Sequence, residues 1–137
     1  MQTLFENSTF AIDYDEQRSL IIQRWFGDLT EEQYKENMKI LVEWILKLPP
    51  VHFNLVYPNL NFPITPELQE WTKSNVFLAV DRHKRLKKAA FIVPQEVFDQ
   101  IVTEFLSVEQ TMEENFDLFE TRYFTSEKDA YMWFAEL

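Results

Sequence analysis

The stretch 19-SLIIQRWFGDLTEEQYKENMKILVEWILKLPPVHFNLVY-57 places one long helical segment between two predicted strands. Residues 19–26 alternate between two faces and residues 51–57 form a second apolar run, so both segments are predicted to be strands. Between them, Thr30 and Gln33 fit a capping box, in which a hydroxyl and an amide satisfy free N–H groups at a helix start. A strand, a helix and a strand in this order predict parallel neighbours joined by a right-handed crossover.

The helix in this stretch ends at Pro49 and Pro50, because proline cannot continue a helix. Its apolar side chains recur at helical spacing and predict one stripe that faces the core. The stripe consists of Tyr34, Met38, Leu41, Val42, Ile45 and Leu46.

Towards the N-terminus, residues 9–14 alternate in the same way, and the polar residues 15–18 separate them from the strand at 19–26. Two alternating runs around a short polar turn predict an antiparallel hairpin. The chain is therefore expected to begin with two strands before its first helix.

Towards the C-terminus, Thr65 and Pro66 resemble an N-cap followed by proline at the first helical position. Residues 89–93 form a wholly apolar run, which is typical of a strand covered on both faces. Residues 95–106 have helical spacing, and residues 118–124 form a last strand. Ser126 is expected to cap a final helix whose buried face comprises Ala130, Trp133, Phe134 and Leu137.

The expected order is thus β-β-α-β-α-β-α-β-α, in a single domain over residues 1–137. It predicts an α/β sandwich with a mixed, mostly parallel sheet and an antiparallel edge strand. The length of 137 residues and the hydrophobic content of 46% suffice for one buried core.

Composition excludes several classes of function. The chain has no Cys and two His, which excludes disulfides, thiolate catalysis and Cys-based or His-rich metal sites. Its one glycine, Gly27, excludes phosphate-binding loops that need several glycines. A net charge of -10 argues against nucleic-acid binding. No apolar run is long enough to span a membrane and the N-terminus lacks a signal sequence, so a cytoplasmic location without a cofactor is expected.

A basic cluster interrupts this acidic chain between Arg82 and Lys88. One interpretation is a contact for an anion or an acidic protein partner, made by Arg82, His83, Lys84 and Arg85. The interpretation that we favour is a helix C-terminus, where cations complement the negative end of the helix dipole.

A second candidate site is the loop at residues 58–65, which follows a predicted parallel strand. Ligands of open α/β sheets usually bind at the carboxyl ends of the strands. Amides, a hydroxyl and aromatic rings near this loop are candidate ligand-binding groups: Tyr57, Asn59, Asn61, Thr65 and Trp71, with Phe62 as a further wall. The alternative that we favour is an Asn/Pro turn whose aromatic side chains reach into the core.

Four segments in this order resemble the SpoIIAA-like, STAS-type domains, especially their small stand-alone bacterial versions. They are 27-GDLTEEQY-34, 65-TPELQEW-71, 86-LKKAAFIV-93 and 122-RYFTSEKDAYMWF-134, and the resemblance spans residues 9 to 137. It implies a STAS-like fold and a regulatory or interaction module that binds a protein partner or forms a homodimer.

The chain departs from one branch of that family, whose phospho-acceptor is a serine preceded by aspartate after the third strand. Residues 57–67 contain neither Ser nor Asp, and Thr65 is their only side chain with an aliphatic hydroxyl. Since Thr65 is expected to cap a helix, the sequence argues against a phosphorylation switch at this place.

Three functions follow as hypotheses. The first is a non-enzymatic STAS-like domain for regulation or protein interaction. The second is a small-molecule or lipid carrier or sensor of the CRAL-TRIO-like type, which the abundance of Phe favours. The third, an enzyme, depends on little more than His83 beside carboxylates and ranks last.

Overall fold

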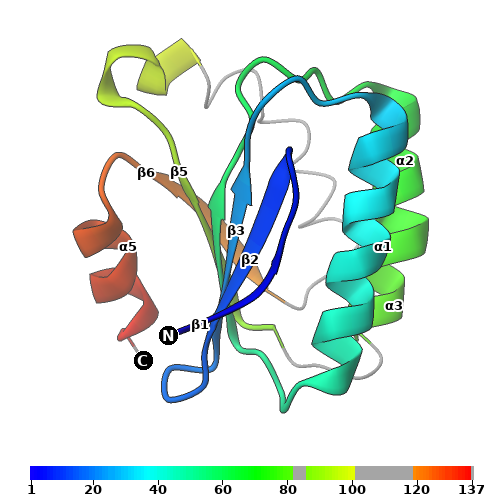
Figure 1. Cartoon of the computed structure of the whole chain (residues 1–137). Helices are drawn as coiled ribbons and strands as arrows, with labels where there is room; N and C mark the ends of the chain where they lie inside the picture. The colour runs from blue at the N-terminus through cyan, green and yellow to red at the C-terminus, as the bar shows by residue number, and fades with distance from the viewer. Residues whose placement is uncertain (82–85, 101–118, 137) are drawn as a thin grey trace.

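A computed structural model of the chain, which describes residues 1–81, 86–100 and 119–136, contains one six-stranded mixed sheet (Figure 1). Neighbouring strands follow the order of the chain from one edge to the other. The strands are β1 (Gln2–Glu6), β2 (Phe10–Asp15), β3 (Leu20–Trp25), β4 (Phe53–Tyr57), β5 (Lys88–Ile92) and β6 (Glu120–Phe124). The pairs β1–β2 and β2–β3 are antiparallel, and the strands β3 to β6 are parallel to one another.

Helices cover both faces of this sheet. On one face lie α1 (Glu31–Lys47), α2 (Pro66–Thr72) and α3 (Leu78–Asp81), the last two joined by a π-helical segment, η1 (Lys73–Phe77). The other face is covered by α5 (Glu127–Phe134), at the left of Figure 1. Because the parallel strands advance in one direction, right-handed crossovers bring α1 and α2 to the same face.

Local sequence signals explain where these helices begin. The capping box of α1 is confirmed: the Gln33 N–H donates to Thr30 Oγ1 at 3.1 Å, and the Thr30 N–H donates to Gln33 Oε1 at 3.0 Å. Thr65 accepts from the Leu68 N–H at the start of α2, and Ser126 accepts from the Asp129 N–H at the start of α5.

Most of the remaining predicted elements are confirmed. The hairpin is β2–β3, and the buried face of α5 contains Ala130, Trp133 and Phe134, whereas Leu137 lies outside the described residues. The helix predicted over residues 95–106 starts as a 3-10 turn, η2 (Gln95–Val97), and continues as helix through residue 100. Residues 101–106 lie outside the described residues.

One strand was not predicted from the sequence: we expected five strands, and the sheet has six. The extra strand, β1, forms the edge beside β2 and is antiparallel to it. A register shift between Thr3 and Phe5 allows Leu4 and Phe5, consecutive residues, both to pack against the core. Such a bulge breaks the period of two on which strand prediction depends.

The predicted stripe of α1 is wrong at one residue. Leu46 has 42% of its surface exposed, whereas Asn37, which was not predicted, has only 2%. Asn37 is tolerated there because it accepts a hydrogen bond from Asn7 Nδ2 and donates one to Thr9 Oγ1. The stripe therefore runs along Tyr34, Asn37, Leu41 and Ile45, the residues of α1 that are buried.

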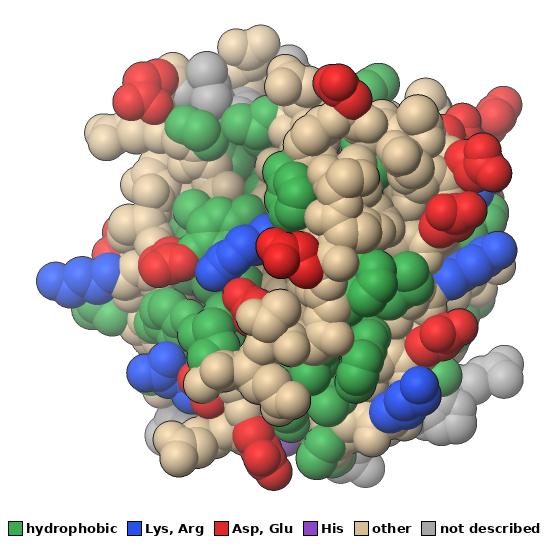
Figure 2. All heavy atoms as spheres, viewed as in Figure 1, with side chains coloured by type: hydrophobic (Ala, Val, Ile, Leu, Met, Phe, Trp, Pro, Cys, Tyr) green, Lys and Arg blue, Asp and Glu red, His purple; other side chains and the backbone are tan. Residues whose placement is uncertain are grey.

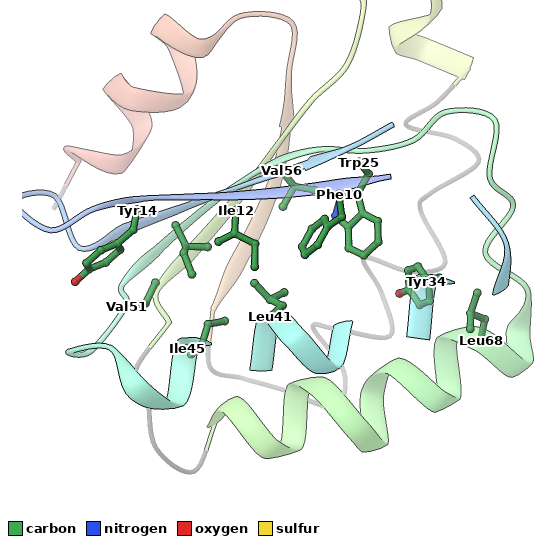
Figure 3. Packing of buried hydrophobic residues seen from close by; sticks show 11 residues of the cluster. Phe10, Ile12, Tyr14, Trp25, Tyr34, Leu41, Ile45, Val51, Val56 and Leu68 are labelled. Atoms are coloured by element: carbon green, nitrogen blue, oxygen red, sulfur yellow. The ribbon is translucent and has the colours of Figure 1, made fainter. Parts of the chain in front are cut away.

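The larger core cluster lies between the sheet and helices α1 and α2. Figure 3 shows Phe10, Ile12, Trp25 and Val56 on the sheet side of this layer, opposite Leu41 from α1. Phe10 and Trp25 are in ring contact, with centroids 4.1 Å apart. A second cluster lies between the sheet and α5, and it contains Leu20, Ile22, Leu55, Ala90, Ala130, Trp133 and Phe134.

Within the described ranges, none of the helices combines the length and the hydropathy that a bilayer crossing requires. On the face seen in Figure 2, acidic and basic side chains are interspersed with hydrophobic ones.

Candidate functional site

A pocket of about 150 Å³ lies between strands β3 to β6 and the helices of the α1–α3 face. Strand residues form its floor: Gln23, Trp25, Asn54, Val56, Ala89, Phe91 and Tyr123. Helix residues form its walls, with Tyr34, Met38, Leu41 and Ile45 from α1 and Gln69, Thr72, Val76, Phe77 and Val80 from the segment α2 to α3. The pocket is therefore built by elements that lie far apart in the sequence.

Ala89 has the smallest side chain among the described residues that line the pocket. In the register of the parallel strands, Ala89 is paired with Asn54 on one side and with Thr121 on the other. Because the side chain of Ala89 is a single methyl group, β5 leaves a space between the larger side chains of the strands on either side. The pocket lies at this small residue of β5. None of the described residues that line the pocket is charged.

Two amides, a buried one on Gln23 and a half-buried one on Asn54, connect the floor to the core. Trp25 Nε1 donates to Gln23 Oε1 at 3.1 Å, and Gln23 Nε2 donates to Asn54 Oδ1 at 2.9 Å. Gln23 has only 4% of its surface exposed, so these bonds offset the cost of burying its amide. We call this chain of three side chains the amide relay.

The hydroxyl groups of the wall are also paired. Thr72 Oγ1 donates to the Leu68 carbonyl at 2.7 Å, so Tyr34 donates its proton to Thr72 Oγ1 at 2.8 Å. Burial raises the pKa of Tyr34 to about 12, although the hydrogen bond to Thr72 acts in the opposite direction. Tyr34 is therefore neutral at physiological pH.

The loop at residues 58–65 closes one end of the pocket through Pro58, Asn59, Phe62 and Ile64. Asn59 Nδ2 donates to the Gly27 carbonyl at 2.9 Å, and Asn59 Oδ1 accepts from the Asn61 N–H. Gly27 has φ +73°, and a Cβ there would lie 2.9 Å from the Ser8 carbonyl oxygen, so the turn requires glycine. The loop is thus anchored to the turn between β3 and α1.

The five residues predicted to bind a ligand near this loop are not gathered together. Asn59 lines the pocket, with its amide engaged in the turn, and the further predicted wall residue Phe62 stacks on Tyr34. Thr65 caps α2, Asn61 is exposed, and Trp71 lies beneath the Lys35 ammonium group.

Tyr57 points to the opposite face of the sheet, where Arg24 lies 4.9 Å from its ring centroid. The pairing of Asn59 agrees with the alternative of an Asn/Pro turn. Binding of a ligand by these five side chains stays a prediction.

Of the basic cluster, Arg82, His83, Lys84 and Arg85 lie outside the described residues. The residues that follow them lie at the amino end of the parallel strands, since the Lys87 N–H donates to the His52 carbonyl at 2.7 Å. Lys87 and Lys88 thus lie at the amino ends of the parallel strands, whereas loop 58–65 follows the carboxyl end of β4. The sequence predicted that these two places lie at opposite edges of the sheet.

Lys88 at this edge supports the last turn of α5. Its Nζ donates to the carbonyls of Trp133 at 2.6 Å and Glu136 at 3.0 Å. A cation at a helix C-terminus complements the negative end of the dipole. The helix concerned is α5 and not the one that precedes the basic cluster, so the role that we favoured for Arg82 to Arg85 stays a prediction.

Sequence reasoning missed Gln23, Asn54 and Ala89 as site residues. The available signal was a polar residue that interrupts an apolar strand, Gln23 in LIIQRW and Asn54 in FNLVY. Their convergence on one face depends on the register between β3 and β4, which a single strand does not reveal.

Comparison with known proteins gave no match among family models, curated proteins or solved structures. The STAS-type resemblance therefore stays a prediction, and the function is inferred from the geometry of the pocket.

Proposed function

We propose that this chain is a STAS-like, non-enzymatic binding domain that holds a small, neutral, largely apolar molecule in the pocket of the α1–α3 face. The observation that carries the proposal is a hollow of about 150 Å³ whose described lining is largely apolar and carries no charge. Apolar surface in such a hollow is costly to hydrate, and a molecule of matching shape removes this cost and adds dispersion contacts.

The size of the pocket limits its ligand. A cavity of about 150 Å³ in an apolar core accepts a benzene-sized molecule, whereas drug-sized ligands need about 300 Å³ or more. An aromatic ring with a short substituent, or a short acyl chain, is the class that fits.

The lining also limits the charge of the ligand. A carboxylate or phosphate would lose its hydration here without a described Lys or Arg in the lining to replace it. We therefore expect neutral molecules to bind and their ionised analogues to be excluded.

The chemistry of the lining favours binding over acid–base catalysis. Tyr34, whose pKa is raised to about 12, holds its proton at neutral pH and donates it to Thr72. A general base requires a pKa closer to the working pH. This supports the non-enzymatic hypothesis over the enzymatic one.

The regulatory or interaction role implied by the STAS-type resemblance stays part of the proposal. The mixed α/β sheet with helices on both faces is compatible with it. A domain that holds a ligand between sheet and helices α1 to α3 can also report the bound state to a protein partner, so the two roles do not compete.

A titration of the isotope-labelled protein by NMR tests the proposal. We use α-methylstyrene as the neutral probe and benzoate as the charged one, with the melting temperature as a second readout. We expect α-methylstyrene to shift the backbone signals of Ala89, Val56 and Tyr34 and to raise the melting temperature, and benzoate to do neither.

The control is Ala89→Leu, which fills the floor with a larger side chain. It should remove the response to α-methylstyrene while the protein stays folded. A wild-type protein that gives no pocket shifts would contradict the proposal, as would binding that Ala89→Leu leaves unchanged.

A further inference from the structure

We propose that Asn54 determines the specificity of the pocket by donating a hydrogen bond from Nδ2 to an acceptor oxygen of the ligand. The inference rests on the proposed function and names the ligand class more closely. It follows from the fixed direction of the amide relay, which begins at an atom that can only donate.

The first step concerns Trp25 and Gln23. An indole N–H is a donor and never an acceptor, so the atom of Gln23 that lies 3.1 Å from Trp25 Nε1 is its oxygen. Both side chains are buried, and water does not compete for the bond. The orientation of the Gln23 amide is thereby fixed.

The second step passes this orientation to Asn54. With its oxygen directed to Trp25, Gln23 presents Nε2 to Asn54 at 2.9 Å, so the Asn54 atom in this contact is its oxygen. Reversing the Asn54 amide would place two N–H groups against each other. In the described part of the chain, Nδ2 of Asn54 has no acceptor, and both of its N–H groups are unused.

The third step compares Asn54 with the other polar groups of the pocket. The hydroxyl protons of Tyr34 and Thr72 are already donated, to Thr72 and to the Leu68 carbonyl. Gln69 on α2 also lines the pocket, but no hydrogen bond of the kind that locks Asn54 fixes its side-chain amide among the described residues. The fixed amides of Gln23 and Asn59 each use one N–H, donated to Asn54 and to the Gly27 carbonyl. Among the described lining residues, Asn54 is the one whose amide is held in one direction with neither N–H donated.

The position of Asn54 makes this donor reachable. It lines the pocket and is paired in register with Ala89, whose short side chain leaves the adjoining space open. A hydrocarbon in the pocket would remove water from Nδ2 without replacing its hydrogen bond, at a cost in affinity. The structure thus assigns the pocket to neutral molecules that combine an apolar body with a carbonyl, ether or similar acceptor.

Two probes of the same shape test the inference. Acetophenone carries a carbonyl oxygen where α-methylstyrene carries a methylene group. We measure the dissociation constants of both by NMR titration, for the wild-type protein and for Asn54→Leu. For each protein we divide the dissociation constant of α-methylstyrene by that of acetophenone. The difference in hydration between the probes affects both proteins equally, so the change in this ratio between wild type and Asn54→Leu reports the hydrogen bond.

We expect Asn54→Leu to reduce the preference for acetophenone over α-methylstyrene by about 5–10-fold, the value of one neutral hydrogen bond. The matched control is Asn61→Leu, which removes an exposed amide from loop 58–65 outside the pocket. It should leave the preference unchanged.

The outcomes separate this inference from the proposed function. If neither probe binds the wild-type protein, the proposed function is wrong. If both bind and Asn54→Leu leaves their relative affinity unchanged, ligand binding stands and the role of Asn54 is wrong.

If Asn54→Leu does not fold, the wild-type protein still decides. Acetophenone, and not α-methylstyrene, should shift the Nδ2 proton signals of Asn54 downfield. Equal signals with the two probes would overturn the inference.

Discussion

The two faces of the same strands differ in what they bury. On the α5 face, Leu20, Ile22, Leu55 and Ala90 are almost completely buried and belong to one apolar cluster. On the α1–α3 face, the residues that alternate with them include polar or small ones, Gln23, Asn54 and Ala89, which line the pocket. Because successive side chains of a strand point to opposite faces of the sheet, the same strands contribute to an apolar core on one face and to the pocket on the other.

On the α5 face, a helix of only eight residues packs on the apolar cluster. Cations on aromatic rings extend its cover: Arg18 lies over Tyr131, and Arg24 lies over Tyr57. Trp133 is approached by both Lys88 and Arg122, at 5.0 and 5.1 Å from its ring centroid. The larger helical layer on the other face nevertheless leaves a hollow, so the number of helices does not decide which face is filled.

The largest effect is expected from a cavity in the filled face. Leu55→Ala should lower the free energy of unfolding by about 2–5 kcal/mol, because Leu55 is fully buried and its neighbours cannot all collapse into the space. Urea denaturation measures this difference. The comparison variant is Val56→Ala, the next residue of β4, which borders the existing pocket and should cost less for each carbon removed, three in Leu55→Ala and two in Val56→Ala. Equal losses per removed carbon would mean that the two faces are packed alike.

The next effect concerns the ionisation of the pocket wall. Burial raises the pKa of Tyr34 from 10.0 to about 12, so the unfolded chain loses this proton at lower pH than the folded one. Stability should therefore fall as the pH rises through this interval, by a total of about 3 kcal/mol from Tyr34. Urea unfolding at increasing alkaline pH measures the loss.

The control for the alkaline effect is Tyr34→Phe, in which the loss should be smaller. It should not vanish, because burial also raises the pKa values of Tyr14 and Tyr131. An identical alkaline loss in Tyr34→Phe would show that the Tyr34 hydroxyl is not the group responsible.

Local signals made much of the fold predictable. Thr30, Thr65 and Ser126 act on the next turn of their own helices, and the hairpin β2–β3 depends on neighbouring residues. β1 escaped because its bulge places Leu4 and Phe5 together against the core. The sequence predicts best those features whose physical cause lies within a few residues.

The candidate site was less predictable for the same reason. Loop 58–65 follows the carboxyl end of a parallel strand, β4, as predicted. Tyr57 nevertheless faces the side of the sheet opposite to the pocket, because side chains alternate along β4 and Asn54 and Val56 face the pocket. The amide relay joins Gln23 to Asn54 across 31 residues, so its existence depends on the register of β3 against β4. Distant pairing of this kind requires the folded chain.

A moderate effect is expected when the filled face is overpacked. Ala90→Leu places three more carbons against Ala130 and Trp133, which belong to the same buried cluster. Overpacking of this kind typically costs about 1–3 kcal/mol, measured by urea denaturation. A variant as stable as the wild-type protein would show that the α5 face contains space after all.

The smallest effect on stability is expected for Ala89→Leu, which lies one residue before Ala90 and on the opposite face of the sheet. Ala89→Leu introduces the same side chain on the same strand, but into the pocket of about 150 Å³. Because the added carbons gain contacts without displacing neighbours, the free energy of unfolding should change by less than about 1 kcal/mol. Denaturation of both alanine variants under identical conditions tests this. If Ala89→Leu cost as much as Ala90→Leu, the pocket would be closed in solution, and a hollow face would no longer distinguish one side of the sheet from the other.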